Sequence, residues 1–367
     1  MSALFEPLRL RSLTIPNRLW MAPMCQYSAA PEGPAASAPG DWHYQHLVAR
    51  AAGGTGLILT EATAVRPEGR ISPYDLGLWN DTQTEAFRRI TDALKEQHSV
   101  PGIQIAHAGR KASTERTWVN RGGPIRHGEG YGWQPVGPSP LAFADGFSTP
   151  SELSREEIGE VVAAFADTAR RALAAGFEVA EIHGAHGYLI NQFLSPYSNR
   201  RTDEYGGSYE NRTRLPLEIV DAVRAVWPEE LPLFFRISAT DWLSEDETDD
   251  REGWTADDTV RFARDLKEHG VDLLDTSTGG NAPDARISAG PDYQVPFAER
   301  VKKETGLAVG AVGLITEAQQ AEKIVADGRA DAVLIGRELL RSPSFAQHAA
   351  RELGASAHIP SPYHRAV

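Results

Sequence analysis

The sequence has one cysteine, Cys25, in 367 residues, and it contains no long apolar run. A single cysteine cannot form an internal disulfide, which is typical of proteins in a reducing compartment. A membrane-spanning helix needs about 18 or more apolar residues in succession, and no stretch approaches that length. Positive charge is scarce too, because 37 Lys and Arg residues oppose 50 Asp and Glu residues for a net charge of −13. We therefore expect a cytoplasmic protein that binds neither nucleic acid nor membranes.

A G-x-G-x-x-G motif is also missing after the first predicted strand, which argues against a Rossmann domain. β-rich runs and helical patterns nevertheless alternate along the chain, and 41% hydrophobic residues supply a sizeable core. The strand candidates are residues 18–24, 56–63, 102–107, 177–183, 233–238, 272–277, 308–312 and 332–336, and helical stretches include residues 82–98, 154–175, 256–269 and 316–326. Eight alternating units predict one α/β domain, a (β/α)8 TIM barrel that spans residues 1–367.

Three further segments refine this prediction. Residues 8–15 have a turn at Ser12 and predict a hairpin that closes the amino-terminal end of the barrel. Residues 107–153 and the acidic residues 239–254 are longer than ordinary barrel loops. Both follow strands, the third and the fifth, so we expect them at the carboxyl-terminal face, where barrel active sites lie. The acidic stretch by itself is typical of a solvated loop.

The predicted strand ends carry most of the candidate functional residues. They are Pro23, Met24, Cys25, Gln26 and Tyr27; Glu61, Ala62 and Thr63; Gln104 and His107; His183, His186 and Tyr188; Arg236; Gly313; and Gly336 and Arg337. Barrels commonly bind phosphate after the last two strands, where Gly lets the main chain approach and Arg pairs with the oxygens. A lone cysteine is more often a small buried hydrophobe than a reactive group.

The pair His183 and His186 allows three interpretations: a metal site, a buried structural pair, or two donors aimed at one substrate oxygen. A metal needs further ligands, and apart from Glu61 the other strand ends offer mostly Gln, Arg and main-chain groups. A metal-dependent hydrolase or isomerase is therefore the alternative. Two imidazoles with the Tyr188 hydroxyl suit a carbonyl or nitro oxygen on which negative charge develops. Such a site needs a cofactor as its hydride source.

Four motifs resemble the Old Yellow Enzyme family. They are APMCQY at residues 22–27, QIAHAGRK at 104–111, HGAHGY at 183–188 and SPYSNRRTDEYGG at 195–207. Within the family they are most similar to the cysteine-bearing bacterial subgroup of xenobiotic reductases and thermophilic-like ene-reductases. The resemblance extends from about residue 4 to residue 353.

The resemblance implies an FMN ene-reductase that takes hydride from NADPH or NADH and passes it, by ping-pong kinetics, to the C=C bond of enones or nitroalkenes. The implied FMN contacts, all non-covalent, are Ala22, Pro23, Met24, Cys25, Ala62, Gln104 and Arg236, with the phosphate at Gly313, Gly336 and Arg337. Arg236 would stabilise the reduced flavin and Cys25 would tune its potential. His183 and His186 would bind the substrate oxygen, Tyr27 would hold the substrate, and Tyr188 would donate the proton.

The resemblance also implies that the tail, about residues 355–367, crosses to a neighbouring subunit and places Arg365 in its site. A homodimer or a tetramer of dimers follows from this. The chain departs from the subgroup by ending in Ala366 and Val367, where an aromatic residue is usual. The tail itself is short and rich in proline, so we expect it not to form a helix.

Overall fold

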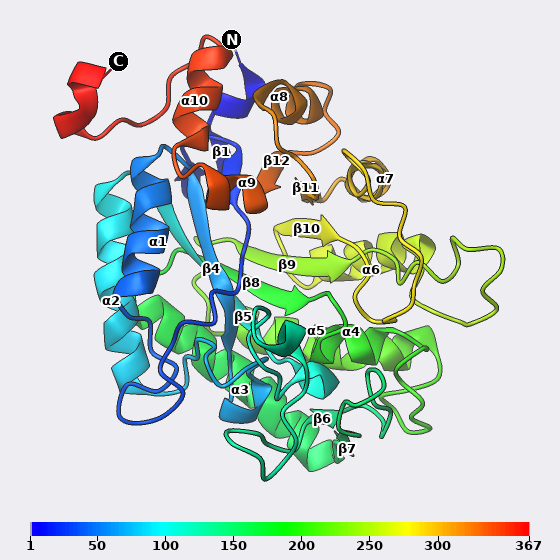
Figure 1. The fold of residues 1–367 in the computed structure, drawn as a ribbon. Coiled ribbons are helices and arrows are strands. Elements are labelled where there is room, and N and C mark those ends of the chain that lie inside the picture. Colours follow the sequence, from blue (N-terminus) through cyan, green and yellow to red (C-terminus); the bar gives the residue numbers. More distant parts are fainter. Residues whose placement is uncertain (1, 367) are drawn as a thin grey trace.

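A computed structural model describes residues 2–366 and confirms the barrel (Figure 1). Eight parallel strands close in the order β10, β11, β12, β3, β4, β5, β8, β9. Their bounds are β3 (Leu19–Met21), β4 (Leu57–Ala64), β5 (Val100–Ala106), β8 (Val179–Gly184), β9 (Leu233–Ser238), β10 (Leu273–Ser277), β11 (Ala308–Val312) and β12 (Ala332–Ile335). Each strand therefore delivers its carboxyl end to one face of the barrel.

Helices surround the barrel, as the alternation predicts. They are α1 (Asp41–Ala52), α2 (Asp81–Glu96), α3 (Arg155–Ala174), α4 (Leu189–Leu194), α5 (Tyr209–Arg224), α6 (Ala256–Glu268), α7 (Val295–Thr305), α8 (Ala318–Ala326), α9 (Arg337–Arg341) and α10 (Phe345–Glu352). The side chains of Asn80, Ser154 and Thr255 each accept a hydrogen bond from the third residue of the helix that follows. These caps explain why the starts of α2, α3 and α6 could be predicted from the sequence. No helix within residues 2–366 is both long and apolar enough to cross a membrane.

The predicted hairpin is present as β1 (Leu8–Leu10) and β2 (Leu13–Ile15). The long segment after β5 contains the short parallel pair β6 (Val136–Gly137) and β7 (Ser151–Glu152). Short 3-10 helices are η1 (Ala3–Phe5), η2 (Pro67–Gly69), η3 (Gly109–Lys111), η4 (Asn120–Gly122) and η5 (Ser361–Ala366). The tail is thus helical over η5, contrary to the expectation. A proline is tolerated in the first turn of a helix because the N–H that it lacks would have no partner inside the helix.

The first barrel strand is also shorter than predicted. It ends at Met21, and residues 22–27 leave the sheet. Pro23 has no N–H for a ladder, and the N–H of Gln26 donates instead to the Glu61 carboxylate at 2.7 Å. The chain is thereby released from the sheet at the mouth of the barrel.

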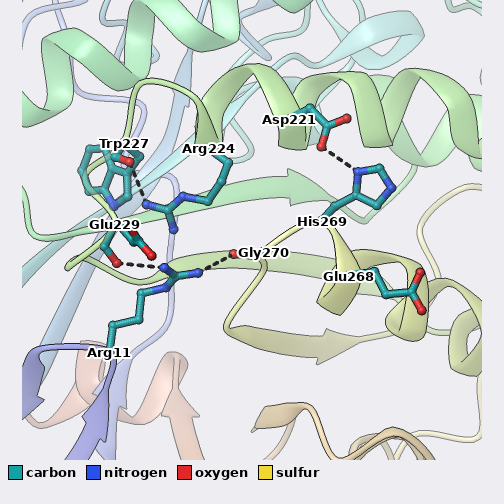
Figure 2. Close-up of a pocket in the computed structure, with 8 residues that line it drawn as sticks. All are labelled: Arg11, Asp221, Arg224, Trp227, Glu229, Glu268, His269 and Gly270. Carbon is teal, nitrogen blue, oxygen red and sulfur yellow. Dashed lines mark hydrogen bonds and ion pairs between the residues drawn. The ribbon is translucent and has the colours of Figure 1, made fainter.

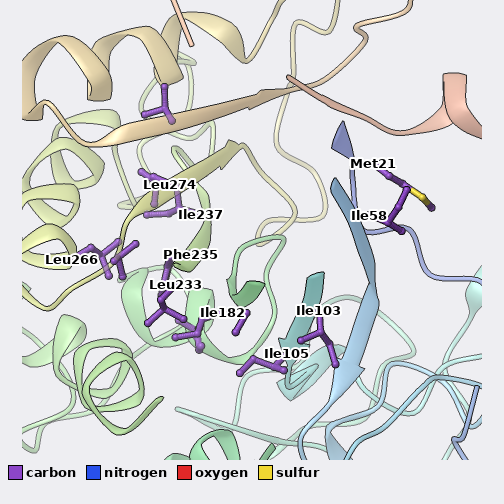
Figure 3. Packing of buried hydrophobic residues seen from close by; sticks show 14 of the residues in the cluster. Met21, Ile58, Ile103, Ile105, Ile182, Leu233, Phe235, Ile237, Leu266 and Leu274 are labelled. Atoms are coloured by element: carbon purple, nitrogen blue, oxygen red, sulfur yellow. The ribbon is translucent and has the colours of Figure 1, made fainter. Parts of the chain in front are cut away.

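Two apolar clusters follow from the alternation of side chains along the strands. Outward-facing residues such as Ile103, Ile182 and Phe235 pack against the helices (Figure 3). Inward-facing residues, among them Val179 and Phe234, fill the lower part of the barrel. Further along the same strands the inward positions become polar. This change marks where the packed core ends and the candidate site begins.

Candidate functional site

The predicted histidine pair forms the centre of the barrel mouth. His183 lies in β8 and His186 follows it with a positive φ of 59°. His183 Nε2 and His186 Nδ1 are 3.3 Å apart, and His186 Nε2 lies 2.8 Å from the Ser277 hydroxyl oxygen. His183 Nδ1 has no partner within residues 2–366.

Burial lowers the pKa of both His183 and His186 well below the usual value, and the positive charge of Arg236 lowers it further. Both imidazoles are therefore neutral at physiological pH. A neutral imidazole has one N–H donor and one acceptor nitrogen. The pair can thus donate to an oxygen, and the positive charge nearby resides on Arg236.

Lys111 holds the turn that carries His186, a role that the sequence analysis did not assign. Its amine donates to the carbonyl oxygens of His186 and Gly280, each at 2.8 Å. Burial, and to a smaller extent the positive charge of Arg110, lower the pKa of Lys111 to about 7. The signal in the sequence is the position of Lys111, directly after Gly109 and Arg110 in the motif of residues 104–111.

Tyr188, Tyr27 and Cys25 pack together at one side of this pair. All three lie against a small apolar cluster that contains Ala62. The Tyr188 ring meets the His183 ring edge-on, with centroids 5.2 Å apart. Burial has the largest effect on the pKa of Cys25, Tyr27 and Tyr188, and it raises all three values. The two phenols and the thiol therefore keep their protons at neutral pH.

A cavity of about 260 Å³ lies at the same end of the barrel and is lined by Arg236, which is paired in register with His183; we call it the mouth cavity. The residues that line it include Ala22, Pro23, Met24, Arg236, Val312, Gly313, Gly336 and Arg337. Seven of these are predicted FMN contacts. Ala62, Cys25 and Gln104, which are also predicted contacts, lie outside this lining.

The mouth cavity suits a ligand that bears phosphate. Gly313 has a φ of 111°, and a Cβ there would come within 2.4 Å of the Gln294 amide. Arg337 forms no ion pair with any residue from 2 to 366, so its guanidinium is free for an anion, whereas Arg341 in the same lining pairs with Glu338. The lining thus matches a flavin mononucleotide, with glycine edges, two paired guanidinium groups and one free guanidinium.

Arg365 is the one predicted site residue that the chain does not bring to the mouth. The segment after α10 extends away from the rest of the chain in Figure 1. His358 packs on His98, with ring centroids 4.8 Å apart, at the loop that precedes β5. The tail therefore lies on the amino-terminal side of its own barrel, and residues 361–365 are exposed.

A larger cavity, of about 740 Å³, lies at that opposite end, and we call it the floor cavity. Figure 2 shows the residues that line it: Arg11, Asp221, Arg224, Trp227, Glu229, Glu268, His269 and Gly270. Arg11 pairs with Asp272 at 2.7 Å, and His269 contacts Asp221 at 2.6 Å. Arg224 donates to main-chain carbonyls, so the two arginines and the histidine have partners, whereas the carboxylates of Glu229 and Glu268 form no ion pair within residues 2–366.

Comparisons with known proteins agree with this geometry. A profile of the NADH:flavin oxidoreductase / NADH oxidase family matches residues 3–355. An NADPH dehydrogenase of Geobacillus sp. (strain WCH70) is 47% identical over 362 residues, 99% of this chain and 98% of that protein. An NADPH dehydrogenase of Bacillus subtilis (strain 168) is 46% identical over the same length, with the same coverage.

Among solved structures, morphinone reductase in complex with tetrahydroNAD is 32% identical, with a TM-score of 0.75 over 99% of this chain and 93% of that one. A 2-naphthoyl-CoA reductase complex with 2-naphthoyl-CoA is 25% identical, with a TM-score of 0.83 over 96% of this chain and 52% of that one.

Proposed function

The chain belongs to the NADH:flavin oxidoreductase / NADH oxidase family, the family of the Old Yellow Enzymes, and is an FMN-dependent oxidoreductase that uses NAD(P)H; from this premise we propose that it reduces activated C=C bonds. The substrates are α,β-unsaturated carbonyl or nitro compounds. The observation that carries the proposal is the cluster of two neutral imidazoles and a protonated phenol, His183, His186 and Tyr188, beside the mouth cavity.

FMN, when bound, supplies hydride that it has received from NAD(P)H. The predicted contacts that line the mouth cavity would hold it, with the phosphate next to Gly313, Gly336 and Arg337. Arg236 lies in the same lining, where a fixed guanidinium stabilises negative charge on the ring system. Ala62, Cys25 and Gln104 would complete the contacts from the neighbouring strand ends.

His183 and His186 would bind the substrate oxygen, with donation from His183 Nδ1, the ring nitrogen that has no partner within residues 2–366, and Tyr27 would hold the substrate. Negative charge grows on that oxygen during the reaction, and donors already in place stabilise it most. Tyr188 would give its proton to the carbon next to the activating group. NAD(P)H and the substrate would use one site in turn, which gives ping-pong kinetics.

The proposal includes a homodimer or a tetramer of dimers. The exposed tail carries Arg365 away from its own mouth cavity, so the arginine can reach a site only in a neighbouring subunit. A cation there would bind near the substrate or the nicotinamide.

Absorbance of the purified protein tests the function directly. We expect yellow protein whose flavin band is bleached by NADPH without oxygen and restored by cyclohexenone. Colourless protein that carries zinc would refute the reductase and support the metal-dependent hydrolase or isomerase. The family assignment does not favour that alternative, and residues 2–366 contain no group of three or more His, Cys, Asp or Glu residues placed to hold a metal.

A further inference from the structure

Two buried carboxyl groups lie inside the barrel at the upper edge of its apolar filling. Glu181 in β8 and Asp275 in β10 are each fully buried. Each carboxyl group faces inward two residues beyond an apolar residue of the same strand. These residues are Val179 and Leu273, which belong to the apolar cluster below. Gln104 is paired in register with Glu181, and Arg236 with Asp275. The carboxyl groups therefore lie directly beside two proposed FMN contacts.

The hydrogen bonds around this pair are incomplete. Gln104 Nε2 donates to Glu181 Oε1 at 2.8 Å, and Arg236 Nε lies 3.0 Å from Asp275 Oδ2. Glu181 Oε2 and both carboxylate oxygens of Asp275 have no hydrogen-bond partner in the described chain, because the contact of Arg236 with Asp275 is an ion pair without hydrogen-bond geometry. Two carboxylates would share one guanidinium here, and a buried charge without a counter-charge is costly. One added proton balances the charge.

We propose that Glu181 and Asp275 share one proton at neutral pH, held by Glu181, and that Glu181 is a positioning residue that acts through Gln104 and Arg236. Asp275 is then the single counter-ion of Arg236. This inference rests on the proposed placement of FMN against Gln104 and Arg236.

The electrostatics assign the proton to Glu181. Burial, followed by repulsion from Asp275, raises the pKa of Glu181 to about 8. Burial raises the pKa of Asp275 to about 6, and Arg236 opposes that rise. The remaining titratable neighbour, His183, is neutral. The two protons of such a pair leave in separate steps, so one proton remains near pH 7.

The arrangement has two consequences for the site, one from the hydrogen bond of Gln104 and one from the neutral acid. Because the Gln104 nitrogen donates to Glu181, the amide oxygen of Gln104 is left to accept from a ligand. Arg236 also keeps only one counter-ion, so more of its positive charge acts on the mouth cavity. Above about pH 8 the loss of the Glu181 proton adds a negative charge, which opposes electron uptake by the cofactor.

The test uses the FMN-loaded enzyme and the variants Glu181→Gln, Asp275→Asn and the double variant. Glu178→Gln is the matched control, because Glu178 is a partly exposed carboxyl that immediately precedes β8 and pairs with Lys95. The first measurement is the infrared C=O band of a protonated carboxylic acid near pH 7. The second is the midpoint potential of FMN from about pH 6 to pH 9.

We expect the protonated-acid band in wild type and in the control, and its loss in Glu181→Gln. Asp275→Asn should lose it too, because Glu181 then ionises as the counter-ion of Arg236. Glu181→Gln should keep the wild-type potential near pH 7 but lose the alkaline decrease. The double variant should have the highest potential, because Arg236 has no counter-ion left.

Burial also raises the pKa of Asp75 to about 7, so the assignment is taken from the difference spectrum between wild type and Glu181→Gln. A difference spectrum without the protonated-acid band would overturn the assignment of the proton. A potential in Glu181→Gln that rises at pH 7 as far as in the double variant would also overturn it, since Glu181 would then be ionised. If the band behaves as expected while no variant changes the potential, the positioning role is refuted. Bleaching of these variants by NADPH would show that the proposed function still stands.

Discussion

The two ends of the barrel each contain a cavity with arginine side chains, and the larger one is not the candidate site. The floor cavity, of about 740 Å³, has no basic group without a partner in residues 2–366: Arg11 pairs with Asp272, Arg224 donates to carbonyls and His269 contacts Asp221. The mouth cavity, of about 260 Å³, has Arg337 without an ion pair in residues 2–366. Next to it lies His183, whose Nδ1 is buried without a partner in the same part of the chain.

The difference shows that unmet hydrogen-bonding capacity identifies the site better than volume does. A buried polar atom without a partner destabilises the fold by roughly 1–3 kcal/mol. A ligand that satisfies such atoms regains that free energy. The guanidinium groups of the floor cavity gain less from a ligand, because they already donate to a carboxylate and to main-chain carbonyls.

The largest effect is expected for His183→Ala combined with His186→Ala. Loss of one donor to a developing oxyanion costs about 100-fold to 1000-fold in rate. The double variant should therefore abolish cyclohexenone reduction and weaken the binding of phenols. His269→Ala, in the floor cavity, is the control and should keep wild-type turnover. An unchanged kcat/KM in the double variant would remove the pair from the mechanism.

Replacement of Tyr188 with Phe should affect only one half-reaction. The proton is needed when the substrate is reduced, so that step should slow by about 100-fold. Oxidation of NADPH needs no proton from this group and should stay close to wild type. Stopped-flow absorbance separates the two steps. Equal slowing of both would assign the proton to another donor.

Much of the mouth could be predicted because its residues follow strands in short, distinctive motifs. Eight alternating units were enough to predict the barrel. The resemblance of the motifs to one family implied ten cofactor contacts. Seven of those ten line one cavity. Their side-chain roles remain predictions that the experiments above address.

The rest depended on contacts between segments far apart in the chain. After β3 the chain leaves the sheet at Pro23, and its course is then fixed by the Gln26 N–H, which donates to Glu61, 35 residues away. Lys111 reaches carbonyls 75 and 169 residues away, which no local pattern reveals. The tail forms η5 although its prolines argue against a helix, because a 3-10 turn needs few N–H donors.

His107 should make the fold sensitive to acid. Burial lowers its pKa to about 3, with a smaller effect of Arg66. The unfolded chain therefore binds a proton below about pH 6.5 that the folded chain does not bind, and stability falls as the pH decreases. At pH 5 this amounts to roughly 2 kcal/mol. Urea unfolding of His107→Gln should show a shallower loss between pH 7 and pH 5, and an unchanged slope would contradict this.

Cys25 should affect the flavin potential more than flavin binding. The thiol packs with Tyr27 and Tyr188 and lies outside the lining that holds Gly336 and Arg337. Cys25→Ser and Cys25→Ala should therefore retain FMN and shift its midpoint potential. Spectroelectrochemistry measures the shift, and the FMN content of the purified variants is the control. Stoichiometric loss of FMN would indicate an anchoring role instead.

The smallest effect is expected at the tail, which belongs to neither cavity of its own chain. Residues 361–365 are exposed, and the packing of His358 on His98 fixes the segment only at its base. If Arg365 completes the site of a neighbouring subunit, deletion of residues 363–367 should raise KM for the enone or NADPH by a few fold, about the effect of one exposed charged contact. FMN content and melting temperature should not change, because the barrel and the mouth cavity are intact.

Arg365→Ala separates the charge from the rest of the tail and should reproduce most of that rise in KM. Because Arg365 would act in the site of a neighbouring subunit, activity per subunit should fall as dilution dissociates the wild-type oligomer. The truncated protein has already lost the contribution and should show a smaller fall. If the truncated protein keeps full activity through dilution to monomers, the tail has no part in catalysis, and the mouth cavity is complete within one chain.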